Sequence, residues 1–168
     1  MSAPNTSVYY HRNIPKGKFG KDVDAGDWDG AAPVTVTIQP GTSQSLQVKK
    51  IVLRVADLFA MSAGDSIVIT MDAYDSATHY QRTVSQATPL LDIIRLGDPD
   101  KYQAKVIGGV NYHIVVIPFE PPAYLRSSET PSESLAFVYN DVGGGVTAGK
   151  LLIDVDYWET AEDDSGLE

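Results

Sequence analysis

The stretch LLIDVDYW at residues 151–158 carries the clearest structural pattern in the chain. Its odd-numbered positions are Leu151, Ile153, Val155 and Tyr157, and its even-numbered positions are Leu152, Asp154, Asp156 and Trp158. Side chains alternate between the two faces of a β-strand, so the odd positions form one apolar face. The stretch therefore predicts a half-buried strand, and similar alternation recurs along most of residues 33–158.

The segment at residues 46–55 shows the same alternation with a break in its phase. Apolar residues stand at even positions 46 and 48 but at odd positions 51, 53 and 55. One extra residue at Lys49-Lys50, as in a β-bulge, would return both sets to the same face. We therefore expect a bulged strand here.

Residues 90–96 are the only stretch with helical character. Thr88-Pro89 precedes them as a cap and first-turn pair, and Gly97 follows. Further along, residues 101–107 predict a strand that ends at Gly108-Gly109. The strand predicted at residues 112–119 is apolar on both faces, so we expect it to lie centrally in a sheet.

Three prolines, at positions 118, 121 and 122, interrupt the pattern after this strand. Proline cannot donate a ladder hydrogen bond, and polar residues follow. We therefore expect a polar loop from Pro118 through Ser134.

Together these signals predict an all-β fold: an antiparallel β-sandwich of about eight strands, of the jelly-roll type, with an extended N-terminal arm. An immunoglobulin-type sandwich is the alternative, although it usually has about seven strands and often a cysteine pair. The 168 residues suit one domain. We expect a basic arm and an acidic turn at residues 1–32, the sandwich at 33–158 and an acidic tail at 159–168.

Charge is distributed unevenly along the chain. The net charge is −9, yet residues 1–21 contain no acid and four cations, Arg12, Lys16, Lys18 and Lys21. Such a segment is either a solvated terminus or an arm that docks on another acidic subunit. Nucleic acid is an unlikely partner for an acidic chain, because phosphate binding needs a positive surface. No apolar run is long enough for a transmembrane helix.

Residues that carry catalytic chemistry are sparse. The chain has no cysteine and three scattered histidines, His11, His79 and His113, of which the last two could meet across paired strands. It also lacks a nucleophile elbow and a phosphate-binding loop. We therefore expect no enzymatic activity and no cofactor.

A loop rich in aspartate is the one candidate metal site. Asp22, Asp24, Asp27 and Asp29 have the acid density of a calcium loop. The EF-hand register fails, however, because Gly26 and Pro33 occupy two ligand positions. We therefore expect no metal, with calcium at these four aspartates as the alternative.

Aromatic residues allow two interpretations. Tyrosine and tryptophan are common at protein interfaces and can also form a platform on which sugars stack. The candidates are Tyr9, Tyr10, Trp28, Tyr74, Tyr80, Tyr102, Tyr112, Tyr124 and Trp158. Tyr9 and Tyr10 lie beside Arg12 in the arm, which favours an interface. We therefore assign partner binding to Tyr9, Tyr10, Arg12, Lys16, Lys18, Lys21 and Trp28.

The general plan resembles the small β-sandwich capsid decoration (cement) proteins of tailed-phage virions. The resemblance rests on chain length, strand pattern, the arm from Val8-Tyr9-Tyr10-His11-Arg12 to Lys21, and the closing strand at residues 151–158. It implies a virion protein on the capsid surface that binds the major capsid protein or other virion subunits. It also implies a homo-oligomer, with a trimer favoured, that stabilises the shell without catalysis. The alternative is a carbohydrate-binding β-sandwich module, in which calcium could take part.

Overall fold

The computed structural model describes residues 17–24, 34–72, 78–127, 133–142 and 144–161. Its helices are α2 (Pro89–Leu96) and the short 3-10 helix η1 (Pro99–Lys101). Its strands are β1 (Gly17–Asp24), β2 (Val34–Ile38), β3 (Gln44–Ala56), β4 (Ala60–Met61), β5 (Ser66–Asp72), β6 (Thr78–Ser85), β7 (Gln103–Ile107), β8 (Val110–Arg126), β9 (Ser134–Asn140), β10 (Val146–Ala148) and β11 (Lys150–Ala161).

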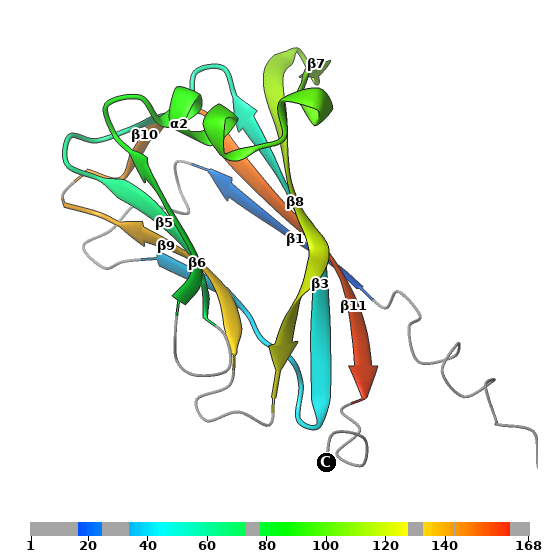
Figure 1. Cartoon of the computed structure of the whole chain (residues 1–168). Coiled ribbons are helices and arrows are strands. Elements are labelled where there is room, and N and C mark those ends of the chain that lie inside the picture. Colours follow the sequence, from blue (N-terminus) through cyan, green and yellow to red (C-terminus); the bar gives the residue numbers. More distant parts are fainter. Residues whose placement is uncertain (1–16, 25–33, 73–77, 128–132, 143, 162–168) are drawn as a thin grey trace, which may run out of the picture.

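The strands form two main sheets that face one another (Figure 1). One sheet has the order β1-β11-β3-β8-β7 and the other β2-β9-β5-β6, while β10 and β4 form a short separate pair. Every pairing is antiparallel. The predicted all-β, antiparallel sandwich is therefore confirmed.

The core lies between the two sheets, because alternate residues of each strand point inward. Ile51, Leu53, Ile153 and Val155 come from one sheet, and Ile67, Ile69, Phe137 and Tyr139 come from the other; all are buried. The odd-numbered face of residues 151–155 is thus the inner face, as the alternation predicts.

The bulge expected at Lys49-Lys50 is confirmed. In the pairing of β11 with β3, Asp156 lies opposite Lys50 and Tyr157 opposite Val48, so Lys49 has no partner. The extra residue restores the phase, and Leu46, Val48 and Ile51 are all buried on the inner face.

The sheet begins earlier than the boundary expected at residue 33. Residues 17–24 form the edge strand β1, which pairs with β11 from Gly17 opposite Tyr157 to Asp24 opposite Lys150. The pairing uses backbone N–H and C=O groups, which every residue other than proline provides, so a polar sequence with little apolar periodicity can still form a strand. Residues 17–24, expected as part of the N-terminal arm, therefore belong to the sheet, while residues 1–16 lie outside the described residues.

Two further expectations are wrong. The acidic tail was expected from residue 159, but β11 continues to Ala161, where it lies opposite Gln44 of β3. The loop expected from Pro118 is instead a continuation of β8 to Arg126. Residues 119–122 have no partner in β3, so two of the prolines fall where no ladder bond to β3 is needed.

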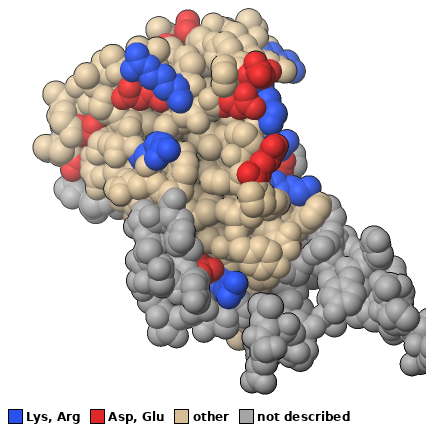
Figure 2. All heavy atoms as spheres, in the orientation of Figure 1, with Lys and Arg blue, Asp and Glu red and all other residues tan. Residues whose placement is uncertain are grey.

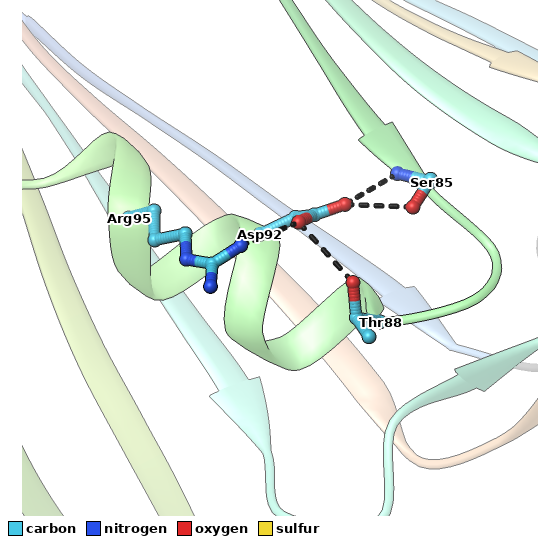
Figure 3. Close-up of polar contacts among 4 residues, drawn as sticks. All are labelled: Ser85, Thr88, Asp92 and Arg95. Carbon is cyan, nitrogen blue, oxygen red and sulfur yellow. Dashed lines mark hydrogen bonds and ion pairs between the residues drawn. The ribbon is translucent and has the colours of Figure 1, made fainter.

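Helix α2 covers one end of the sandwich, as Figure 1 shows, and matches the predicted helical stretch. Its attachment to β6 depends on Asp92 (Figure 3). The Asp92 carboxylate accepts hydrogen bonds from the Ser85 amide (3.0 Å), the Ser85 hydroxyl (2.8 Å) and the Thr88 hydroxyl (3.2 Å). The two hydrogen bonds from Ser85 are the main reason why the pKa of Asp92 is lowered.

Neither described helix is long and apolar enough to cross a membrane.

Replacing Asp92 with asparagine is expected to lower the free energy of unfolding by about 1 kcal/mol at neutral pH, because charged acceptors make the stronger bonds. The folded-state pKa of Asp92 lies below its ordinary value of 3.8. The contribution of Asp92 to the free energy of unfolding is therefore complete above pH 3.8, and it disappears as the pH falls through the lower pKa of the folded state. Urea unfolding of parent and Asp92→Asn across acidic pH should show the two curves converging. A constant difference at all pH values would contradict this account, and Asp100→Asn, an exposed aspartate, is the control.

Candidate functional site

The predicted partner-binding residues divide into two groups. Tyr9, Tyr10, Arg12, Lys16 and Trp28 lie outside the described residues. Lys18 and Lys21 lie in β1, where their register partners in β11 are Asp156 and Ile153. Lys18 and Lys21 are therefore part of the sheet edge.

The first two residues of the alternative calcium site do not lie in a loop. Asp22 and Asp24 lie in strand β1 with continuous pairing to β11, whereas a calcium loop must turn around the ion. Asp27 and Asp29 lie outside the described residues. Within the part that the structure describes, no three His, Cys, Asp or Glu side chains are grouped so as to hold a metal ion.

Charged side chains on the outer surface lie in mixed groups of both signs. Figure 2 shows Lys and Arg beside Asp and Glu on the visible face. On the sheet that contains β3 and β11, Lys50 Nζ lies 3.2 Å from Asp156 Oδ2, and Arg54 pairs with Asp154. Asp154 and Asp156 are thus both paired with cations of the neighbouring strand.

The β7–β8 hairpin is the most exposed element described. Every residue from Lys101 to Val110 is exposed. Gly108 and Gly109 have φ angles of 57° and 81°, which fit the tight type I′ turn that joins two antiparallel strands. Apart from the adjoining residues, no atom of the described residues lies within 4 Å of the place where a Cβ would stand on either glycine. The tip therefore projects away from the rest of the described molecule.

Apolar side chains are concentrated at this tip. Val106 is 66% exposed, Ile107 42% and Val110 44%. Ile107 lies directly opposite Val110, while Val106 alternates to the other face of the hairpin. The tip thus presents apolar surface on both faces, and β7 is the edge strand of its sheet.

A polar cluster ties the base of the hairpin to the end of β3. His113 Nε2 lies 2.7 Å from Asp57 Oδ1, and His113 Nδ1 lies 2.5 Å from the Tyr102 hydroxyl. The Tyr102 and His113 rings also stack, with centroids 6.0 Å apart. The hydrogen bond from His113 lowers the pKa of Asp57.

This cluster functions best as an anchor. With Nε2–H donating to Asp57 and Nδ1 accepting from Tyr102, both ring nitrogens of His113 are used within the cluster. His79 lies in β6, which belongs to the other sheet, so the two histidines are not on paired strands. No local sequence pattern indicates this cluster, because its three members are brought together only by the pairing of β3 and β7 with β8.

A second group of interest lies on the outer face at the far end of the same sheet. Gln47 of β3 lies opposite Trp158 of β11 on one side and opposite Tyr124 of β8 on the other. Gln47 Nε2 donates to the Tyr124 hydroxyl at 2.9 Å, and Lys49 Nζ lies 3.6 Å from the centre of the Trp158 ring. Both aromatic residues were among the sugar-stacking candidates, but their alignment across three strands is a result of the fold.

The fold defines the class of this chain as an antiparallel all-β sandwich protein. Comparison with known proteins found no matching family model, no similar curated protein and no similar solved structure. Function must therefore be argued from the surface itself.

Proposed function

We propose that this protein is a non-enzymatic structural protein of a virion, which binds the capsid surface and stabilises the shell through subunit contacts. The proposed partners are the major capsid protein or other virion subunits. Three features support the proposal: the strand order of the sandwich, the projecting apolar hairpin and the basic N-terminal segment.

We also infer that the sandwich is of the jelly-roll type. Strands β1-β11-β3-β8 of one sheet face β2-β9-β5-β6 of the other. When these eight strands are followed along the chain, they alternate between the two sheets, except that β5 and β6 are neighbours in the same sheet. Such an arrangement of eight strands in two Greek keys is characteristic of jelly rolls, which are common in capsid domains. Fold alone does not imply function, so this support is by analogy.

The hairpin is the observation that carries the proposal. Val106, Ile107 and Val110 expose apolar area at the tip of an element that projects into open space. Water contact with these side chains is unfavourable, so their exposure on both faces of a projecting hairpin favours a contact site. Burial of the tip in a neighbouring subunit would remove the unfavourable hydration and supply binding energy.

The basic arm supports the proposal as a second contact. The described sheet edge begins at Gly17, so residues 1–16, with Tyr9, Tyr10, Arg12 and Lys16, precede it. Cations on such a segment complement acidic subunits and guide docking, while tyrosines contribute contact area. Trp28, which follows β1, is proposed as a further aromatic contact residue.

A binding experiment with shells tests the role of the hairpin. Empty shells lacking this protein, isolated from the virus that encodes it, are mixed with purified protein and sedimented. The parent should co-sediment with shells, and replacing Val106 and Ile107 together with serine should weaken binding about tenfold or more, because full burial of each aliphatic side chain contributes about 1.5–3 kcal/mol. A chain that starts at residue 17 should also bind more weakly while retaining its β-sheet circular dichroism.

The matched control is Val142→Ser, since Val142 is also exposed but lies on the connection that follows β9. It should bind like the parent. Light scattering is expected to show a homo-oligomer, with a trimer favoured. Failure of the parent to sediment with shells would refute the proposed function, and undiminished binding by the serine variant would refute the role of the hairpin.

A further inference from the structure

We propose that the row formed by Trp158, Gln47 and Tyr124 is a binding site for a neutral oligosaccharide. The site lies on the outer face of the sheet β1-β11-β3-β8-β7 and is independent of the proposed attachment to a shell. Three observations support it: the alignment of the two aromatic residues, the amide between them, and the position of Lys49.

Strand register aligns the two aromatic residues. Trp158 and Tyr124 are the partners of Gln47 in the two neighbouring strands, so they stand two strand spacings apart, roughly 10 Å. Cross-strand partners have their side chains on the same face of the sheet. Tyr124 is 48% exposed. Two aromatic groups separated along a flat sheet can each contact one sugar ring of an extended chain.

The amide between the aromatic residues supplies hydrogen-bonding capacity. Gln47 Nε2 donates one hydrogen to the Tyr124 hydroxyl at 2.9 Å. A glutamine amide has a second N–H and an acceptor oxygen, and a tyrosine hydroxyl can both donate and accept. A sugar presents donors and acceptors around an apolar C–H face, so a row of ring, amide and ring offers complementary chemistry. The hairpin tip differs, because its exposed side chains are aliphatic and suit a protein partner.

The Lys49 ammonium shows which kind of group the Trp158 ring attracts. Lys49 Nζ lies 3.6 Å from the ring centroid, where the negative face of the π system attracts positive charge. The C–H bonds of a pyranose carry partial positive charge and can make the same contact. Lys49 is the bulge residue without a strand partner, and lysine has a long flexible side chain, so its ammonium can be displaced by a ligand.

Charge favours a neutral ligand over an anionic one. Asp156 lies on the same strand face as Trp158, two residues away, and is paired with Lys50. The chain as a whole carries −9. An anionic glycan would have to approach against this field, whereas a neutral chain would not.

The two surfaces lie at opposite ends of β8. The hairpin precedes Val110 at the start of the strand, and Tyr124 lies near its end at Arg126 (Figure 1). A protein held at the hairpin could therefore keep the aromatic row accessible. The two proposals are tested separately, since one uses shells and the other uses free sugars.

Tryptophan fluorescence gives a direct test. The chain has two tryptophans, so a Trp28→Phe variant leaves Trp158 as the sole reporter. This protein is titrated with the neutral hexasaccharides of β-1,4-linked glucose, xylose and N-acetylglucosamine, and with a sialylated glycan. We expect saturable changes in Trp158 emission with at least one neutral chain and a weaker response to the sialylated one.

Substitutions identify the site. Isothermal titration calorimetry with the best neutral chain should show about tenfold weaker binding for Trp158→Ala and about fivefold weaker binding for Tyr124→Ala, as expected for loss of one ring contact. Lys49→Ala should bind roughly twofold to fivefold more tightly, because a competing cation–π contact is removed. The matched control is Tyr102→Ala, which should bind like the parent, because this exposed tyrosine precedes β7 and contacts His113 near the start of β8, away from the aromatic row.

Several outcomes would overturn the proposal. These are no binding of any neutral hexasaccharide at millimolar concentration, unchanged affinity in both aromatic variants, or weaker binding by Lys49→Ala. If Trp158→Ala reduces sedimentation with shells instead of sugar binding, this face is a protein interface. Circular dichroism and the melting temperature of each variant show whether it is folded, and Trp158→Phe, which keeps an aromatic ring, should retain most of the affinity.

Discussion

Replacing Asp65 with alanine is expected to lower the free energy of unfolding by about 3–5 kcal/mol. Asp65 lies between β4 and β5 and is only 2% exposed. Its carboxylate accepts hydrogen bonds from the Tyr139 hydroxyl, from the Ser62 amide at 3.2 Å and from the Val142 amide at 2.9 Å. One side chain thus connects strand β9 with the β4–β5 loop and the β9–β10 loop.

The size of the effect follows from what the substitution leaves behind. Without the carboxylate, three donors lose their acceptor, and each buried unsatisfied donor costs about 1–3 kcal/mol. The Tyr139 hydroxyl is the most affected, because its ring is fully buried in the core. Burial, and then the hydrogen bond to Asp65, raise the pKa of Tyr139, so its hydroxyl remains protonated and needs an acceptor.

Urea unfolding followed by circular dichroism measures the loss for Asp65→Ala. A double-mutant cycle with Tyr139→Phe then isolates the bond between the two side chains, since the pair should show non-additivity of about 1 kcal/mol or more. The exposed Asp100 is the control, and Asp100→Ala should change stability by less than about 0.5 kcal/mol. A loss below about 1 kcal/mol for Asp65→Ala would show that the buried carboxylate does not stabilise the fold as described.

Gly149→Ala is expected to cost about 2–4 kcal/mol of unfolding free energy. Gly149 joins β10 to β11 and has a φ angle of 77°, a left-handed conformation that disfavours any side chain. A Cβ there would lie 2.7 Å from Phe59 Cα and 2.8 Å from Phe59 N. Because these are backbone atoms, the segment between β3 and β4 would have to move.

Gly109→Ala is the matched control for this substitution. Gly109 has a similar φ angle of 81°, but its Cβ would stand in open space at the hairpin tip. It should therefore show only the conformational cost of about 1–2 kcal/mol. Thermal and urea unfolding of both variants separate strain from steric overlap, and equal losses for the two would mean that the contact with Phe59 is relieved without cost.

Local patterns in the sequence predicted much of the sandwich. The change of parity between Val48 and Ile51 indicated a bulge, and the structure has one at Lys49. The segment after Thr88-Pro89 indicated the helix. These features were accessible because alternation, helix capping and turn chemistry depend on residues close together in the chain.

Features that depend on strand partners were missed or misplaced. Strand β1 has little apolar periodicity and owes its conformation to backbone bonds with β11, so it was read as part of an arm. The prolines of β8 suggested a loop, but residues 119–122 of the strand have no partner in β3. The local composition of both segments indicates that they are polar. It does not indicate which strand each of them pairs with.

The candidate sites show the same division. Trp158 and Tyr124 could be named as aromatic candidates from the sequence, and Val106, Ile107 and Val110 could be recognised as apolar. That the first two flank Gln47, which is 77 residues from Tyr124, depends on how β11, β3 and β8 pair. The exposure of the hairpin tip likewise depends on where the rest of the fold ends.

Local sequence patterns specify which side chains share a strand face, where the alternation shifts, and that the chain is mainly β. Those properties follow from the geometry of a single extended chain, in which successive side chains point in opposite directions. Three further features depend on the folded arrangement: residues 17–24 join the sheet, Asp65 bonds Tyr139, and an aromatic row crosses three strands. Partner choice and register arise from long-range packing of the two sheets, because the same backbone groups are offered by almost every residue and burial selects among the possible pairings.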